Sequence, residues 1–139
     1  MTPQRLAAER LVLQRYFPSL NLNETGRLTV GTLVTNAGNR YSVAFDIPAS
    51  FPDSPPTVFV TDPVLTDFDG DPLYTTGVSS TMHTLGPRGT EVQICHSHPN
   101  KWHAHDTLYQ VALKVRLWLE AYELHLRFGQ NLDHFLPHA

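Results

Sequence analysis

Cysteine is nearly absent from the sequence: Cys95 is the only one among 139 residues. A single thiol cannot form a disulfide within the chain, which favours a reducing compartment. The net charge is only −3, so no basic stripe marks a nucleic-acid partner. No apolar run approaches the roughly 20 residues that span a bilayer, and the N-terminal residues lack the apolar core of a signal peptide. These absences predict a soluble cytoplasmic protein that binds neither nucleic acid nor membrane.

The length of the chain is typical of one domain with one hydrophobic core, and we assign residues 1–139 to it. The hydrophobic fraction, 41%, is ordinary for a globular protein. The sequence contains no internal repeat and no low-complexity tract. Nothing in it indicates a bound cofactor, and we expect none.

Helix signals occur near both ends of the chain. Thr2 and Pro3 suit the cap and first turn of a helix that Pro18 ends. Thr107 and Gln110 form a capping box for a second, longer helix. The first helix has an apolar face made of Leu6, Leu13 and Phe17. Steps of three and four residues predict the buried face of the second: Leu108, Val111, Ala112, Val115, Trp118, Leu119 and Tyr122.

Strand signals lie between the two helices. Residues 28–34 are rich in β-branched side chains, residues 41–47 alternate between apolar and polar, and residues 57–60 form a third short apolar segment. Residues 128–135 are expected to add a short helix at the end. A helix, an antiparallel β-meander and then C-terminal helices predict an α+β fold.

Cys95 ends a short apolar segment, residues 92–95, and a histidine-rich polar loop follows it. One interpretation is structural, because free cysteine most often serves as a small buried hydrophobe. The other is a nucleophile, because a thiol at a strand end that faces a polar loop meets water, protons and a partner's carbonyl. His96, His98 and Lys101 are close enough in sequence to lower the pKa of the thiol.

Four features occur in order along the chain. The proline-rich segment, residues 51–58, leads into a strand, Cys95 follows an isoleucine, Trp102 lies shortly after it, and Thr107 begins the last helix. This arrangement resembles the E2 ubiquitin-conjugating enzymes, which have a tyrosine-proline and proline-proline segment, an active-site isoleucine-cysteine, a tryptophan and a helix-starting threonine in this order. The resemblance covers the chain from about residue 3 to residue 122.

The resemblance implies a ubiquitin-conjugating-enzyme-like fold and a thioester acyl transferase activity. Cys95 would carry a ubiquitin-like protein as a thioester and pass it to an amine on a protein target. The implied partners are that ubiquitin-like protein, an E1-like activating enzyme and the target. In E2 enzymes the first helix helps to bind the activating enzyme, which makes Arg5, Arg10 and Arg15 candidate partner-binding residues. A solvated surface is the alternative interpretation of these arginines.

The chain departs from the family near its cysteine. E2 enzymes supply an oxyanion donor from the asparagine of an upstream His-Pro-Asn motif, and here the upstream counterpart is His83 without the asparagine. A His-Pro-Asn sequence occurs downstream instead, with His98 and Asn100. His83, His98 and Asn100 are therefore candidate supporting catalytic residues, with chance occurrence in a turn as the alternative. The family's acidic residue after the cysteine has no match at Ser97. These departures resemble divergent bacterial E2-like proteins.

Residues 62–89 make a longer connection than the family has, and we interpret them as a lid or a partner-docking loop. The acidic residues 67–71 within it superficially suggest calcium, but their spacing does not fit an EF-hand, so we predict a solvated turn. Two other functions are alternatives to the E2 reaction. Cys95 and its neighbouring histidines could bind zinc, although no strong zinc spacing is present. The second alternative is a noncatalytic E2-like binding module, although such variants typically lose the cysteine.

Overall fold

The fold is described by a computed structural model for residues 1–136, apart from the side chain of residue 99. That part of the chain contains two α-helices, six strands and three short 3₁₀ helices. The elements are α1 Pro3–Tyr16, β1 Leu20–Leu22, β2 Leu28–Val34, β3 Arg40–Asp46, β4 Thr57–Asp62, η1 Leu73–Thr76, β5 Thr84–Arg88, β6 Glu91–Ile94, η2 Pro99–Lys101, α2 Leu108–Phe128 and η3 Leu132–His134. The predicted α+β class is confirmed.

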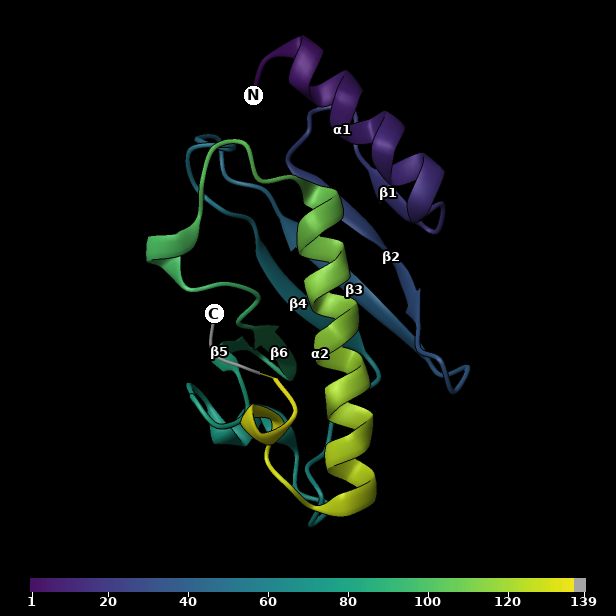
Figure 1. The fold of residues 1–139 in the computed structure, drawn as a ribbon, viewed down its shortest axis with the longest axis vertical. Coiled ribbons are helices and arrows are strands. Elements are labelled where there is room, and N and C mark those ends of the chain that lie inside the picture. The colour runs from purple at the N-terminus through teal and green to yellow at the C-terminus, as the bar shows by residue number, and fades with distance from the viewer. Residues whose placement is uncertain (137–139) are drawn as a thin grey trace.

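The strands form one antiparallel sheet in the order β1-β2-β3-β4-β6-β5. The first four strands make a meander in which each strand pairs with the next. β6 then lies beside β4, and β5 forms the edge of the sheet. Helix α2 runs across one face of the sheet, and α1 lies beside β1 at one end of the molecule (Figure 1).

Helix α1 begins and ends where the sequence predicts. The side chain of Thr2 accepts a hydrogen bond from the amide of Arg5, Pro3 occupies the first turn, and the helix ends before Pro18. Of the predicted apolar face, Leu13 and Phe17 are buried and Leu6 is half-buried. The same helix also buries Glu9, which a pattern of apolar residues does not predict.

The three predicted strands are present, with boundaries that differ by at most two residues. The sequence prediction missed β1, because a strand of three residues is too short to show an alternating pattern. β1 contributes Leu20 and Leu22 to the core. The chain entering β1 passes so close to β2 that a Cβ atom on Gly31 would overlap the carbonyl oxygen of Ser19, and glycine is the residue that fits there.

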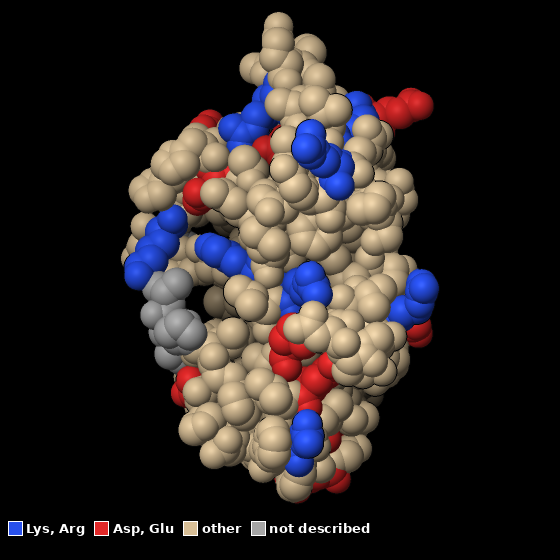
Figure 2. Space-filling model, turned by 45° about the vertical axis from the view of Figure 1, so that its right-hand side comes forward, with Lys and Arg blue, Asp and Glu red and all other residues tan. Residues whose placement is uncertain are grey.

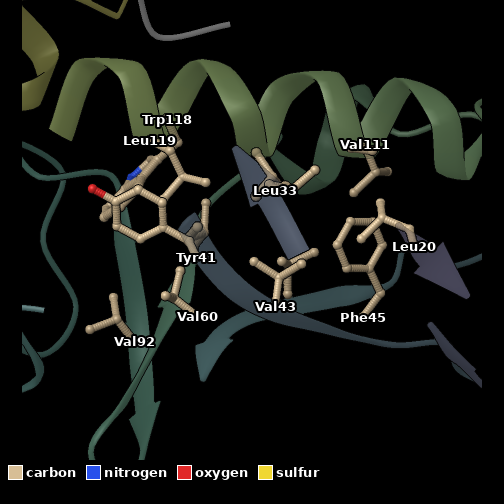
Figure 3. Close-up of a cluster of buried hydrophobic side chains, with 14 of the residues drawn as sticks. Leu20, Leu33, Tyr41, Val43, Phe45, Val60, Val92, Val111, Trp118 and Leu119 are labelled. Atoms are coloured by element: carbon tan, nitrogen blue, oxygen red, sulfur yellow. The ribbon is translucent and has the colours of Figure 1, made fainter. Parts of the chain in front are cut away.

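Helix α2 supplies most of the helical part of the core. Thr107 and Gln110 form the predicted capping box, and Gly129 ends the helix in a left-handed conformation. All seven residues of the predicted face are buried. Of these, Val111, Trp118 and Leu119 point toward the side chains of the sheet, so that the core lies between the helix and one sheet face (Figure 3). Each large apolar side chain that is fully buried contributes about 1.5–3 kcal/mol to stability.

The long connection between β4 and β6 is packed against the domain. Leu65, Leu73 and Met82 from it are buried in the core, and its last part forms β5. Tyr122 in α2 holds it by accepting from the amide of Thr66 at 3.1 Å and donating to the carbonyl of that residue at 2.7 Å. A lid that opens freely is therefore a poor description of residues 62–89. Within residues 1–136, no helix combines the length and apolarity that crossing a membrane requires.

Candidate functional site

Cys95 directly follows β6 and begins the loop that leads to α2, which we call the Cys95 loop, residues 95–107. In Figure 1 this loop swings out from the sheet before it returns to the start of α2. The cysteine is a free thiol and is half-buried. Its amide donates a hydrogen bond to the carbonyl of His83 at 2.9 Å, and its sulfur lies 3.8 Å from the carbonyl oxygen of Ser97. The strand therefore fixes the backbone of Cys95 while its side chain stays at the boundary with solvent.

His83 lies opposite Cys95 because β5 and β6 pair with Thr84 across from Ile94. It is buried, and its backbone has a positive φ of 53°, a conformation that costs a non-glycine residue about 1–3 kcal/mol. Its carbonyl accepts from two donors, the amide of Cys95 and the indole N–H of Trp118 at 3.1 Å. The fold thus brings the predicted upstream histidine to the cysteine, joined to it through the backbone.

His98 and Asn100 lie further along the Cys95 loop, and both are exposed. They contact each other, since the amide of Asn100 donates to Nδ1 of His98 at 3.2 Å. Among the contacts of the described residues, none joins either side chain to Cys95. Their role as supporting catalytic residues stays a prediction.

His96, the residue after Cys95, is held by a hydrogen bond to the proline-rich segment. Its Nε2 lies 2.8 Å from the carbonyl oxygen of Pro56, so this nitrogen carries the proton and donates. Burial lowers the pKa of His96, the hydrogen bond to Pro56 opposes this, and the charge of Lys114 lowers it further. The ring is therefore neutral near pH 7 and does not supply the positive charge that its place next to Cys95 suggested.

Trp102 connects the Cys95 loop with the proline-rich segment. Its indole N–H donates to the carbonyl of Pro52 at 2.8 Å, and its ring lies 6.1 Å from that of Phe51. The rings of His96 and Trp102 also pack edge-on, with their centroids 6.4 Å apart. Trp102 and the proline-rich segment, which lie far apart in the chain, are therefore in direct contact.

The three candidate arginines of α1 do not share one face. Steps of five residues turn an α-helix by about 140° each, which spreads positions 5, 10 and 15 around its axis. Arg5 bonds to the carbonyls of Ala104 and Asp106, and Arg10 bonds to that of Asn23 at 2.8 Å. Arg15 is exposed. On the face drawn in Figure 2, basic and acidic side chains are interspersed among uncharged ones.

The described residues offer little to a metal ion. Across residues 1–136, no three side chains of histidine, cysteine, aspartate or glutamate converge in a way that could hold one. Asp67 accepts from the amides of Asp69 and Asp71, both at 2.9 Å, and so forms the predicted turn. His103 and His105 stack at 5.2 Å on the surface of the Cys95 loop. The geometry gives the zinc alternative no support.

No protein-family model, curated protein or solved structure matches this chain.

Proposed function

We propose that the protein is an E2-like conjugating enzyme with a ubiquitin-conjugating-enzyme-like fold. In this proposal Cys95 carries a ubiquitin-like protein as a thioester and transfers it to an amine on a target. An E1-like activating enzyme supplies the loaded protein. The noncatalytic E2-like module is the alternative.

The contact between Trp102 and the proline-rich segment carries this proposal. The sequence resemblance rested on separate features along the chain. Nothing in the sequence alone required that these features be in contact. In the structure, Trp102 bonds to Pro52 and packs on Phe51, in the loop that begins at Cys95. The order of the elements supports it too, with a helix, a meander of four strands and a long helix directly after the cysteine loop.

The chemistry proposed for Cys95 is two acyl transfers. The Cys95 thiolate attacks the thioester carbonyl of the loaded activating enzyme, a new C–S bond forms, and the enzyme's own thiolate leaves. An amine of the target then attacks the Cys95 thioester, an amide forms, Cys95 leaves as thiolate, and the amine gives up its proton to a base. A thiolate suits both steps, since it attacks well and also leaves well.

The test is thioester formation with purified components. Incubation of the chain with ATP, an E1-like activating enzyme and its ubiquitin-like protein should produce an adduct that is visible on nonreducing gels and lost with reductant. Cys95→Ala should abolish the adduct, and Cys95→Lys should trap an adduct that resists reductant. Because the chain has a single cysteine, an adduct that persists unchanged in Cys95→Ala would rule out the assignment.

One observation favours the noncatalytic alternative. The exposed Asn100 has no described contact that brings it to Cys95, so the oxyanion donor of the family is not in evidence at the thiol. The conjugating enzyme and the noncatalytic module differ in whether a thioester forms on Cys95 and in whether it is then discharged to an amine. An enzyme should discharge its thioester to an added amine, whereas a noncatalytic module should form no thioester under conditions in which its partner still binds.

A further inference from the structure

The residue that follows Cys95 is anchored to a different part of the sheet from Cys95 itself. The amide of Cys95 bonds to His83, which lies on the β5 side of β6. The ring of His96 bonds to the carbonyl of Pro56, just before β4, on the opposite side of β6. Consecutive Cα atoms are about 3.8 Å apart, so an anchor at residue 96 restrains the backbone of residue 95 directly. Cys95 and its neighbour His96 are thus held by the residues that immediately precede the two neighbouring strands, β5 and β4.

The anchor uses only one edge of the imidazole. Nε2–H donates to Pro56, the ring packs against Trp102, and Nδ1 is buried with no hydrogen-bond partner among the described residues. A buried acceptor without a donor costs about 1–3 kcal/mol, and a leucine of similar size would fill the same space without that cost. The bond to Pro56 is the interaction that the imidazole makes here and that a leucine could not make.

We propose that His96 is a positioning residue for Cys95, which acts through its Nε2–H bond to Pro56 and fixes the thiol for acyl transfer. This inference rests on the proposed function for its consequence in catalysis. The anchor itself is a property of the free protein and needs no partner. The anchor distinguishes His96 from His98, whose side chain is exposed on the surface of the same loop.

A pair of amide substitutions tests the anchor. The side-chain nitrogen of Gln stands close to the place of histidine Nε2, whereas the side chain of Asn is one carbon shorter and stops near the place of Nδ1. His96→Gln should therefore keep the bond to Pro56, and His96→Asn should lose it. Both variants replace the neutral imidazole with a neutral amide, so they differ mainly in reach.

Four readouts report on the anchor. The ¹⁵N shifts of the His96 ring should show the Nε2–H form. Hydrogen exchange of the Cys95 amide in His96→Asn should be at least about tenfold faster than in the wild type, and in His96→Gln within about threefold of it. Reaction of Cys95 with iodoacetamide should accelerate in His96→Asn while thioester charging with the activating enzyme slows about tenfold, and His96→Gln should restore both rates.

A general loss of stability is controlled by Leu33→Ala, a core variant on β2. It should lower the urea midpoint without changing the iodoacetamide rate under native conditions. The inference is overturned if the ring carries its proton on Nδ1, or if His96→Gln and His96→Asn give the same exchange and alkylation rates. The ¹⁵N, exchange and alkylation measurements use the chain alone, so they can fail while charging succeeds, and they can succeed while no charging is found.

Discussion

The indole N–H of Trp118 donates to the carbonyl of His83 at 3.1 Å, and the same carbonyl accepts from the amide of Cys95. Helix α2 therefore supports the strand pairing that holds the nucleophile candidate. We expect Trp118→Phe to lose this donor and to leave a small cavity, at a cost of about 2–3 kcal/mol in the free energy of unfolding. Urea denaturation measures it. Leu117→Ala, an exposed position on the same helix, should change stability by less than about 0.5 kcal/mol.

The carboxylate of Glu123 collects three donors at the far end of α2. Its Oε2 accepts from Tyr41 at 2.7 Å and from Thr35 and Asn39, both at 2.9 Å. Burial raises the pKa of Tyr41, and the bond to Glu123 raises it further. Since the folded state then keeps its proton above pH 10 while the unfolded state loses it, stability should fall as pH rises beyond about 10.

The expected slope is up to about 1.4 kcal/mol per pH unit for Tyr41. Urea unfolding between pH 9 and about 11 measures it. Tyr41→Phe should remove this contribution and leave that of Tyr122, whose pKa is also raised by burial. An unchanged slope in Tyr41→Phe would show that the phenol of Tyr41 ionises equally in both states.

His96 should cause a loss of stability at acidic pH, in contrast to the loss at alkaline pH that is expected from Tyr41. The pKa of His96 is lowered by burial, so the unfolded chain takes up a proton below about pH 6.5 before the folded chain does. Stability should be fully present above that pH and should be lost as pH falls, by up to about 1.4 kcal/mol per unit. His96→Gln should flatten this part of the curve. If it does not, another group governs acid unfolding.

Substitutions at Arg5 test whether its charge or its hydrogen-bond geometry is what stabilises the fold. Its Nε bonds to Glu9 at 2.9 Å, and its two terminal nitrogens bond to the carbonyls of Ala104 and Asp106 at the end of the Cys95 loop. Glu9 in turn accepts from the amide of Leu108, the first residue of α2, at 3.0 Å. Lysine keeps the charge but has no planar fork. Arg5→Lys should therefore cost about 1–3 kcal/mol in urea denaturation, almost as much as Arg5→Ala.

Arg40→Lys, at an exposed position that begins β3, is the matched control and should be close to neutral. If Arg5 serves instead to attract an activating enzyme, Arg5→Lys should be as stable as the wild type and should load at a similar rate. Loading that slows only on charge reversal at Arg10 and Arg15 would assign docking to those two.

Asn100→Ala tests the missing oxyanion donor under the proposed function. If its amide reaches the tetrahedral intermediate, discharge of a preformed thioester to an amine should slow about a hundredfold, with little change in folding stability. Single-turnover discharge isolates this step from loading. His83→Ala and His98→Ala are the parallel variants. Unchanged rates in all three would place the donor on a partner protein or on residues 62–89.

The sequence predicted the elements whose signals are local. The caps at Thr2 and Thr107 and the spacing of the α2 core require only neighbouring residues, and all were confirmed. The features that it missed depend on contacts between distant segments. The burial of Leu65 and Leu73 within the long connection leaves no periodic trace, since η1 and its flanking turns have no fixed repeat.

The same limit applies to the site. Cys95 and the upstream His83 were selected through their resemblance to the E2 pattern, and a catalytic role for either one stays a prediction. The sequence did not predict that His96 reaches Pro56 or that Arg5 reaches Ala104, because these bonds join residues far apart in the chain. Side-chain partners of this kind become visible only when the sheet register and the path of the loop are known.

The position of β6 beside β4 has a consequence for the order of folding. The strands of the meander are joined by short connections, whereas β6 pairs with β4 only after residues 63–90 have closed into a loop. Longer closures cost more entropy and non-local strand pairs form slowly. We expect the meander to form early and β6 to dock late. During that interval the thiol of Cys95 is open to oxidants, from which the finished sheet partly shields it.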